Sequence, residues 1–401
     1  MWEQIRANWI RSVFIMVAMG FLLIALGYML GYYFFGEGAP GVVVALVAWA
    51  IMNLVAWFEG DNILLSLGNA RKVKKADFPR LYNVVEEMTI ASGLPRIPDI
   101  YIIDDPALNA FATGRKPENA SVAVTSGLLQ KMDRDELQGV VAHELGHIKN
   151  RDTLLMAIGG ILLGTIVVLS NYASRLLFYD GAPSRRRNSR DSGGGGEIII
   201  LAVGLILLVL APVAARLLYF ALSRKREYLA DASSALYTRY PGGLASALEK
   251  IASTPTQLKS ASTATAPMYI VNPFRKAGQA FANLSSTHPP TMDRIKVLRA
   301  MGGASFHDYD IAFRALRGGR GSVIPPGAQA AIGVMALRAP SAEPTLDADT
   351  EVKQAREVSN ALWQANDYRT VDCPCGVRMR IPPKMKAKQV KCPRCGTIHP
   401  L

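Results

Sequence analysis

Long uncharged apolar runs occur in two pairs along the chain. The first pair comprises residues 12–35 and 42–58, and the second comprises residues 153–174 and 198–215. A helix needs about 20 consecutive apolar residues to cross a bilayer, so each run has roughly the required length. Half of the residues are hydrophobic, which excludes an intrinsically disordered chain. The pattern predicts an integral-membrane protein with soluble parts between and after its apolar pairs.

Basic residues around the first pair predict its orientation. Arg6 and Arg11 precede it, and a basic cluster at residues 71–75 follows it. The connection at residues 36–41 contains no lysine or arginine. Because positive charge favours the cytoplasmic side, we expect the N-terminus and the chain after the first pair in the cytoplasm. A cleaved signal peptide is excluded, because the first run is too long and lacks a small-residue cleavage site.

The charge of the segment that connects the two runs of the second pair opposes this rule. It contains five arginines between residues 175 and 190, so full spanning by both runs would place a basic loop outside. Two arrangements stay open. Either the basic residues around the first pair determine the orientation of the whole chain, or the second pair forms a hairpin only partly within the membrane. Residues 184–196 are rich in Ser, Gly and Arg, which predicts a flexible connection.

The block between the two pairs mixes helical and strand patterns. Residues 77–92 place apolar side chains at helical spacing, and residues 99–103 form a short apolar run typical of a strand. Residues 109–115 and 120–125 are expected to form a strand pair. The predicted fold class is α+β: a mainly helical protein with a small sheet.

The strongest chemical pattern is His143-Glu144-Leu145-Gly146-His147. On a helix, positions i and i+4 lie on one face, so His143 and His147 can bind one Zn²⁺. Glu144 then lies where it can take a proton from a water molecule at the metal. Asp133 or Asp135 can cap this helix. Two histidines placed by chance are the alternative, and with only five histidines in the chain the spacing disfavours it.

A zinc site of this kind needs a third ligand. No histidine follows His147 before His288, so a nearby third histidine is excluded. Glu227 is the best candidate for the third ligand. Asp231 lies at i+4 from it on the same helical face, where the Asp231 carboxylate can accept a hydrogen bond from a ligand histidine. The alternative for Glu227 is a solvated charge beside basic neighbours.

These motifs resemble the HtpX-type membrane zinc metallopeptidases, which are relatives of the CAAX prenyl endopeptidases. The resemblance covers roughly residues 1–300. The matching segments are residues 109–114, residues 143–147, Glu227 with Asp231, and residues 287–290 followed by Arg294.

The resemblance implies further roles. It assigns Asn109, Ala110 and Phe111 to an edge strand that binds the substrate backbone, and it brings His288 and Arg294 to the active site, where a histidine can stabilise the oxyanion. Each role has an alternative: Asn109 as a turn residue, His288 as a helix cap, and Arg294 as a buried ion-pair partner.

All four cysteines lie in the last 29 residues, which predicts a metal site in a reducing compartment and not a disulfide framework. Two pairs, Cys373 with Cys375 and Cys392 with Cys395, are typical of a zinc ribbon that holds one structural Zn²⁺. The first pair departs from the usual two-residue spacing. Free cysteines or a redox pair are the alternative.

The net charge of +13 is concentrated in places, and residues 369–395 hold eight Lys or Arg against one Asp. Lipid headgroups or a protein partner both suit such a tail. No aromatic row for stacking bases occurs there, so there is no strong case for nucleic acid.

The sequence predicts an α+β, mainly helical integral-membrane metallopeptidase with a small zincin-type sheet and a C-terminal zinc ribbon. Its expected parts are a membrane hairpin at 1–60, a metallopeptidase domain at 61–300 interrupted by a membrane hairpin at 153–222, a linker at 301–352 and a ribbon at 353–401.

The expected function is a zinc endopeptidase of the bacterial-type plasma membrane with a cytoplasmic active site. By resemblance, its polypeptide substrates are damaged or misassembled membrane proteins. A CAAX-type processing peptidase and an inactive scaffold that recruits partners through the ribbon are the alternatives. The oligomeric state stays open.

Overall fold

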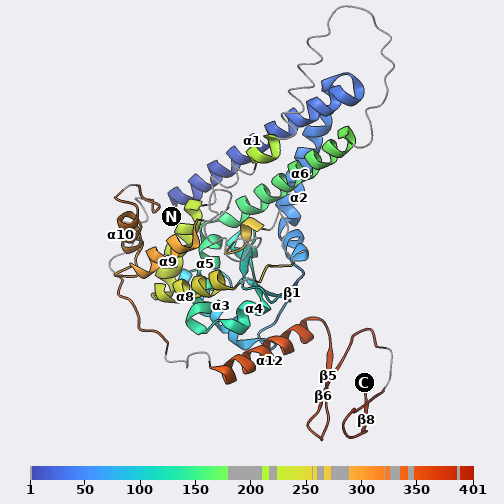
Figure 1. The fold of residues 1–401 in the computed structure, drawn as a ribbon, viewed down its shortest axis with the longest axis vertical. Coiled ribbons are helices and arrows are strands. Elements are labelled where there is room, and N and C mark those ends of the chain that lie inside the picture. Colours follow the sequence, from blue (N-terminus) through green and yellow to red (C-terminus); the bar gives the residue numbers. More distant parts are fainter. Residues whose placement is uncertain are drawn as a thin grey trace, which may run out of the picture.

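A computed structural model of the 401-residue chain gives the arrangement in Figure 1. The structure describes residues 2–178, 210–215, 224–254, 256–259, 266–271, 289–319, 321–325, 335–341, 347–385 and 389–401. His288 and most of the fourth apolar run lie outside these ranges, so the expectations placed on them stay predictions.

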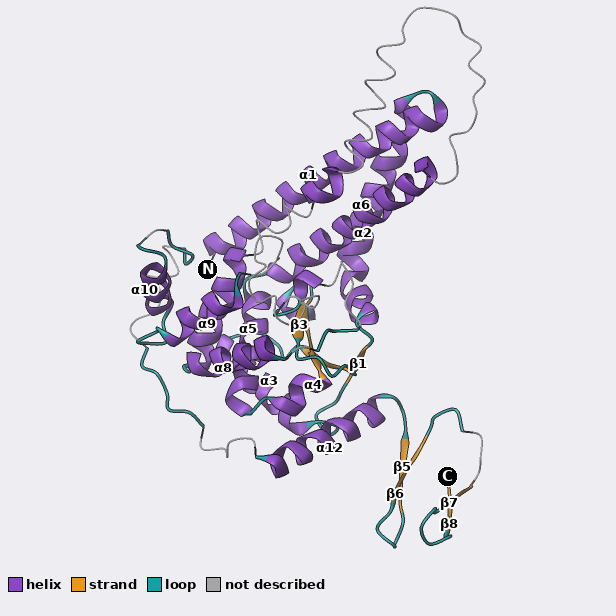
Figure 2. Cartoon of the chain, viewed as in Figure 1, coloured by secondary structure: helices purple, strands orange, loops and turns teal. Residues whose placement is uncertain are grey.

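Three long helices form a bundle that projects from one end of the molecule (Figures 1 and 2). They are α1 (Trp2–Phe35), α2 (Gly38–Leu67) and α6 (Asp152–Phe178). α1 and α2 pack so closely that a Cβ added at Gly41 would lie 1.9 Å from the carbonyl oxygen of Gly27. Only glycines permit this approach, which is how small residues hold helices together in a membrane.

Among the described residues, two stretches are long and apolar enough to cross a membrane, by length and composition alone. They are Gly38–Leu67 and Asp152–Asn171, and Met16–Tyr32 is a shorter apolar stretch. Large apolar side chains on the bundle, such as Phe21 and Val44, are exposed. Such an apolar exterior suits lipid and does not suit water. Of the fourth predicted run, residues 210–215 are helical.

A four-stranded sheet lies below this bundle. Its strands are β1 (Ala70–Lys72), β2 (Asp99–Ile103), β3 (Ala110–Thr113) and β4 (Ser121–Thr125), in the order β1-β2-β4-β3. β2 runs parallel to β4, whereas β1 and β3 are antiparallel to their neighbours. The three predicted strands are all present, and β3 lies at an edge of the sheet.

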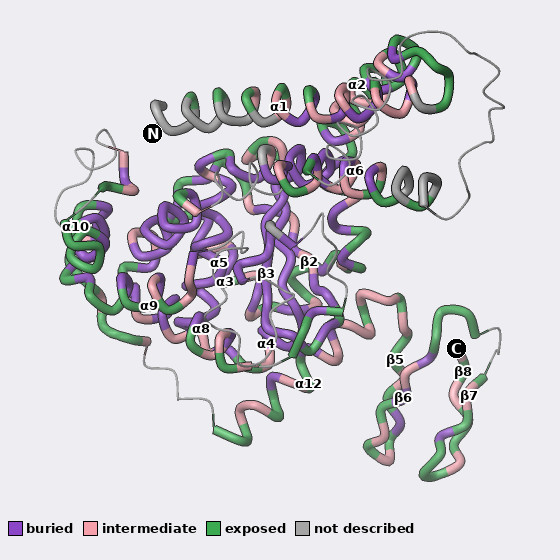
Figure 3. The backbone as a smooth tube through the Cα atoms, turned by 45° about the horizontal axis from the view of Figure 1, so that its top comes forward, coloured by how far each residue is buried: buried purple, intermediate pink, exposed green. Residues whose placement is uncertain are grey.

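Helices pack around this sheet and bury its apolar residues (Figure 3). The apolar spacing of residues 77–92 produces α3 (Pro79–Ser92), whose buried face includes Leu81 and Val85. The other helices of this body are α4 (Ser126–Lys131), α5 (Arg134–Lys149), the helix over residues 224–238, α8 (Pro241–Ser253), α9 (Thr291–Arg299) and α10 (Phe306–Leu316). Two short 3₁₀ turns are η1 (Pro117–Asn119) and η2 (Ala266–Met268).

The predicted linker is partly fixed on this body of sheet and helices, which we call the catalytic body because it contains the predicted metal ligands. Arg338 donates from Nη2 to Oδ1 of Asp135 over 2.7 Å, and the backbone N–H of Ser341 donates to Oδ2 of the same carboxylate over 2.7 Å. Arg338 also donates from Nε to the carbonyl of Thr238 over 2.9 Å. The described part of the linker thus connects the start of α5 to the end of the helix over 224–238.

The tail begins with α12 (Ala348–Ala365), which packs against the catalytic body. Val358 and Ala361 are fully buried in the main core, and Lys131 of α4 pairs with Glu351 at 3.1 Å. This helix starts before the expected ribbon boundary at 353. Two small hairpins follow, formed by β5 (Arg369–Asp372) with β6 (Arg378–Ile381) and by β7 (Gln389–Lys391) with β8 (Ile398–Pro400). They lie at the end opposite the α1–α2 bundle (Figure 1).

Candidate active site

α5 carries the histidine-glutamate pattern through the centre of the catalytic body. Its start is fixed by a capping box, in which Asp133 accepts from the N–H of Glu136 and Glu136 accepts from the N–H of Asp133. Its two glycines allow close packing: a Cβ at Gly139 would lie 2.6 Å from the nitrogen of Leu244. A Cβ at Gly146 would lie 3.0 Å from Cβ of Ser233, in the helix over 224–238.

α5 does not continue unbroken into the apolar helix that follows it. α5 ends at Lys149, Arg151 has a left-handed φ of 56°, and α6 begins at Asp152. The turn brings the Asp152 carboxylate back to His147, where Oδ2 lies 3.2 Å from Nδ1. A continuous helix would not bring position i+5 onto the face of His147.

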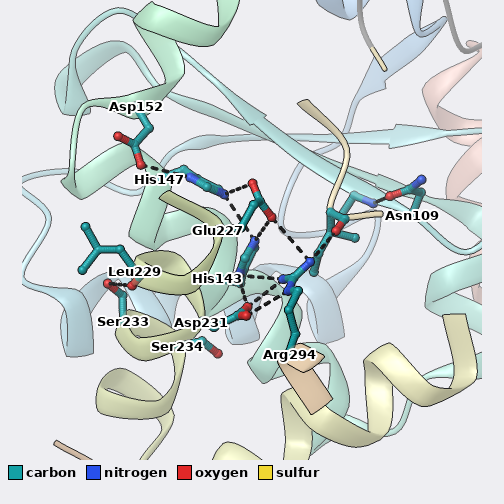
Figure 4. Close-up of polar contacts among 12 residues, drawn as sticks. Asn109, His143, His147, Asp152, Glu227, Leu229, Asp231, Ser233, Ser234 and Arg294 are labelled. Atoms are coloured by element: carbon teal, nitrogen blue, oxygen red, sulfur yellow. Dashed lines mark hydrogen bonds and ion pairs between the residues drawn. The ribbon is translucent and has the colours of Figure 1, made fainter. Parts of the chain in front are cut away.

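His143, His147 and Glu227 lie together, with one ligand atom of each within 4.8 Å of the others (Figure 4). The two Nε2 atoms are 3.2 Å apart, and they lie 3.6 Å and 3.4 Å from the Glu227 oxygens. Zinc bonds of about 2.0–2.2 Å in a tetrahedron separate neighbouring donors by about 3.3–3.6 Å. The three side chains therefore fit one Zn²⁺ without rearrangement.

Each histidine is oriented through its other ring nitrogen. Nδ1 of His143 lies 3.0 Å from Oδ1 of Asp231, as the i, i+4 spacing from Glu227 predicted, and Nδ1 of His147 faces Asp152. Such contacts fix the tautomer and turn Nε2 toward the metal position. Burial lowers the pKa of His147, but Asp152 and Glu227 outweigh it and raise the pKa to about 10 in the absence of metal. This site attracts a cation strongly.

Arg294 of α9 neutralises the carboxylates behind the ligands. It donates to both oxygens of Asp231, over 2.6 Å and 2.8 Å, and its Nη1 lies 3.4 Å from Glu227. Burial opposes ionisation of Asp231, but the guanidinium outweighs it, and the pKa of Asp231 lies below its usual range. The structure thus places Arg294 in a buried ion pair with Asp231 and also beside Glu227, a predicted zinc ligand.

Glu144 is the free acid-base group of the site. It is buried, and neither carboxylate oxygen has a hydrogen-bond partner among the described residues. Burial raises the pKa of Glu144 and outweighs the two histidines, which lower it. A buried carboxylate with no partner is costly, so its position indicates a group kept free for chemistry.

The expected substrate strand lies beside this centre. Asn109 is buried, and its amide donates from Nδ2 to the carbonyl of Val271 over 3.0 Å. Its Oδ1 accepts from the N–H of Ala110 over 3.1 Å. Phe111 packs edge-on against Tyr269, with ring centroids 5.2 Å apart. In this structure the side chain of Asn109 therefore holds two parts of the chain together.

A second cluster of metal-binding side chains lies in the tail. Cys373, Cys375, Cys392 and Cys395 place their sulfur atoms within 4.8 Å of one another. The Cys373–Cys395 and Cys375–Cys392 sulfur distances are 3.4 Å and 3.6 Å. Zn–S bonds of about 2.3 Å in a tetrahedron require about 3.8 Å, so a small expansion admits the ion. The short first pair does not prevent the cluster from forming.

Asp152 and residues 266–271 are the parts of this site that the sequence analysis missed. Asp152 directly follows the helix of His147, and an acid so close to a ligand histidine was a usable signal. Residues 266–271 carry no motif, and their place becomes visible only in the folded chain.

Comparisons with known proteins agree with this geometry. The profile described as Peptidase family M48 matches residues 75–302. A Protease HtpX homolog from Dictyoglomus thermophilum is 46% identical over 301 residues, which are 75% of this chain and 95% of the relative. A Protease HtpX homolog from Pyrococcus furiosus is 44% identical over 294 residues, 73% of this chain and 95% of the relative.

Among solved structures, the crystal structure of S. mikatae Ste24p aligns with a TM-score of 0.37 at 19% identity, over 74% of this chain and 66% of that chain. That similarity is too low to carry an argument. The family profile covers more than half of the chain, and the relatives align over nearly their whole length. The resemblance found in the sequence is confirmed: the chain belongs to peptidase family M48 and is a membrane zinc metalloprotease.

Proposed function

We propose that this protein hydrolyses peptide bonds of damaged or misassembled membrane proteins at the cytoplasmic face of a bacterial-type plasma membrane. The observation that carries the proposal is the buried group of His143, His147 and Glu227, together with Glu144, whose carboxylate has no hydrogen-bond partner in the part of the chain that the structure describes. A scaffold without activity has no use for this arrangement, because a free buried carboxylate destabilises the fold.

In the proposed reaction, His143, His147 and Glu227 hold the zinc ion. Bound zinc supplies a Lewis acid that polarises the scissile carbonyl and increases the acidity of water. Glu144 takes the proton of the attacking water and later gives it to the leaving amine. Glu144 holds the proton between these two steps, and its burial favours the protonated form.

Asp231, Asp152 and Arg294 act by positioning. Asp231 and Asp152 hold the two histidines, and Arg294 keeps the Asp231 carboxylate ionised. We assign stabilisation of the oxyanion to His288, which the resemblance places at the site. This assignment depends on a residue outside the described ranges.

The substrate backbone is proposed to add to β3. The N–H of Thr125 in β4 donates to the carbonyl of Asn109, just before β3. In an antiparallel pair, the main-chain groups of successive residues face alternate sides, so those of Ala110 and Ala112 face away from β4. That outward edge can accept an extended peptide by strand addition. Phe111 and Ala110 then lie beside the bound chain.

The position of the site relative to the bundle supports membrane substrates. α6 begins at Asp152, which contacts His147, so the first residue of an apolar helix lies at the catalytic centre. Thr113 at the end of β3 donates to Asp61 of α2 over 2.8 Å, which ties the edge strand to the other membrane helix. Cleavage near the cytoplasmic membrane border follows from this placement and from the charge pattern.

The tail is proposed to hold a second, structural zinc ion between its four cysteines. Its hairpins lie at the end opposite the membrane bundle, so lipid headgroups are not their natural partner (Figure 2). A protein partner in the cytoplasm fits the basic surface better.

The test uses the full chain purified in detergent, with zinc content measured beside cleavage. The substrates are an unfolded multi-pass membrane protein, its folded form and a prenylated CAAX peptide. We expect cleavage of the unfolded form by wild type and none by Glu144→Gln, with equal zinc in both. Cleavage of the prenylated peptide alone would favour the CAAX-type processing peptidase, and cleavage by Glu144→Gln would overturn the mechanism.

A further inference from the structure

The catalytic centre is closed in this structure. His143, Glu144, His147 and Glu227 are exposed by 0%, 1%, 2% and 2% of their surface. A peptide substrate must reach Glu144 and the metal position with its main chain. Part of the protein therefore has to move before a substrate binds.

A segment of this chain already lies on the outward edge of β3. The N–H of Ile270 donates to the carbonyl of Ala110 over 3.0 Å, which is the bond that an added strand would make there. The next carbonyl, that of Val271, accepts from the side chain of Asn109. We call residues 268–271 the strap.

The strap is also held from the other side of the site. Nη1 of Arg294 donates to the carbonyl of Ile270 over 2.8 Å, while the same guanidinium binds Asp231. Ile270 thus bridges the edge strand and the positioning network through its own N–H and C=O. A main chain held on both sides beside the metal position is what an extended substrate would require.

The strap fills its place with apolar side chains. Met268, Tyr269, Ile270 and Val271 are exposed by 4% or less, and Tyr269 packs edge-on against Phe111. Met268 and Tyr269 share a buried cluster with Met156 and Ala157 of α6, near the membrane end of the catalytic body. A peptide that takes this place must bury comparable apolar side chains to offset the loss of these contacts.

We propose that the strap occupies the substrate's place as an internal pseudosubstrate, and that cleavage requires an extended apolar segment to displace it. This inference rests on the proposed function, and it adds the substrate class. Aromatic and β-branched side chains are selected, because they replace Tyr269, Ile270 and Val271. Folded soluble proteins bury such segments, whereas misassembled membrane proteins expose them.

The contrasting arrangement is a strap that stays in place as a fixed wall, with substrate pairing only beyond it. The two differ in what happens at Ala110. Under displacement, the carbonyl of Ala110 changes its partner from Ile270 to the substrate. Under the fixed wall, that bond persists during turnover.

A reversible crosslink separates the two. The Ile270–Ala110 hydrogen bond joins the strap to β3, so a disulfide between cysteines at these two positions would hold the strap in place. The variant A110C/I270C is oxidised in the full zinc-loaded chain, and mass spectrometry counts the crosslinked fraction. The single variants, oxidised alike, control for the tail cysteines. We expect cleavage of the unfolded membrane protein to fall at least tenfold and to return with reductant. Unchanged cleavage by crosslinked enzyme overturns the proposal.

A second pair of variants tests the proposal without a crosslink, in case the cysteine variant does not fold. Ile270→Pro removes the N–H that binds Ala110, and Ile270→Ala shortens the side chain while keeping the N–H. We expect a lower KM for the proline variant than for the alanine variant, because its strap leaves more easily. A KM for Ile270→Pro equal to or above that of Ile270→Ala, with zinc content unchanged, contradicts the proposal.

Binding without turnover gives a readout independent of activity. Hydrogen exchange of residues 268–271 is followed in Glu144→Gln, with and without a peptide whose core repeats Met-Tyr-Ile-Val. A control peptide carries Gln-Ser-Asn-Gln in those positions. We expect the apolar peptide alone to release the strap amides. If the strap amides stay protected while the peptide is bound, the displacement proposal is overturned. This experiment tests displacement even if the wild-type protein cleaves nothing. A lack of cleavage would refute the proposed function alone.

Discussion

Asp152 Oδ2 lies 3.2 Å from Nδ1 of His147, although the two residues belong to different helices. The contact exists because the chain turns at Arg151, whose φ is 56°, instead of continuing α5 into α6. The same turn that orients a zinc ligand therefore also sets the direction in which the membrane helix leaves the catalytic body. Zinc binding and membrane attachment share one junction.

Asp152→Asn should weaken zinc binding by roughly 10- to 100-fold, because the neutral amide no longer orients and polarises His147 as the carboxylate does. Competition with a chelator of known affinity measures the change. Asp231→Asn should give a similar loss through His143. Asp349→Asn, at an exposed position of α12, is the matched control and should leave zinc affinity unchanged. Wild-type affinity in Asp152→Asn would show that the contact does not support the ligand.

Glu144→Gln should keep one catalytic zinc and lose about 10²- to 10⁴-fold in kcat, because the carboxylate is a base and not a ligand. Single-turnover cleavage with parallel metal analysis is the measurement. Loss of zinc together with activity would instead place Glu144 among the ligands.

The same substitution should change stability in a pH-dependent way. Burial raises the pKa of Glu144 above its ordinary 4.5, so the metal-free folded state holds this proton more tightly than the unfolded chain. Stability from this group is present at low pH and is lost as the pH rises above the ordinary value. Metal-free Glu144→Gln should therefore unfold at a higher temperature than metal-free wild type at pH 7, with the difference vanishing below about pH 4. A lower unfolding temperature of the variant at pH 7 would refute this.

Arg294→Met should destabilise the metal-free protein by about 3–5 kcal/mol, because it leaves Asp231 and Glu227 as buried carboxylates without their cation. Chemical unfolding in detergent measures the loss. Arg299→Met is the control in the same helix: Arg299 pairs with Glu249 while both side chains are 46% exposed, and such a surface pair contributes less than about 1 kcal/mol. Equal effects of the two substitutions would mean that the buried network is not a stabilising unit.

Local patterns in the sequence predicted which site residues share a helix face. The histidine face of α5 and the i, i+4 pair of Glu227 and Asp231 follow from helical spacing, which is a property of neighbouring residues. The sequence left the cap open between Asp133 and Asp135, and the structure has Asp133 at that position. The strand at 99–103 was equally visible, but its parallel pairing with β4 was not, because pairing depends on distant segments.

The features that escaped prediction depend on tertiary structure. A single left-handed residue, Arg151, breaks a helix that composition alone would continue, and arginine carries no signal for that conformation. The strap and α12 are bound to the catalytic body by side chains of no distinctive pattern, such as Ile270 and Val358. Their places are set by the shape of the surface that they cover.

Truncation can test how much of the tail the fold requires. The full chain should bind two zinc ions, and a chain ending at residue 366 should bind one and remain active. A chain ending at residue 350 should bind one zinc as well, but unfold more easily by at least about 2 kcal/mol, because it loses the buried Val358 and Ala361. Unfolding and zinc content of the three chains are compared. Loss of catalytic zinc on ending at 366 would make the ribbon part of the active site.

Cleavage should concentrate in substrate segments close to the cytoplasmic membrane border. α6 has 27 residues and is about 40 Å long at 1.5 Å per residue, whereas the hydrocarbon core is about 30 Å thick. If α6 spans, about 10 Å of it extends beyond the core, and its first residue, Asp152, contacts the ligand His147. The catalytic centre then lies within about 10 Å of the hydrocarbon edge, and tethered substrates reach it with short flexible segments.

A series of single-span substrates tests this placement. An identical unstructured apolar segment is inserted at about 5, 10, 20 and 40 residues from the membrane border, and the same segment without a span is the control. We expect the fastest cleavage at the short distances and the slowest in the soluble control, because membrane attachment raises the local concentration at the site. Cuts within the span, cuts on the opposite side of the membrane, or equal rates at all distances would show that the catalytic centre does not lie at this border.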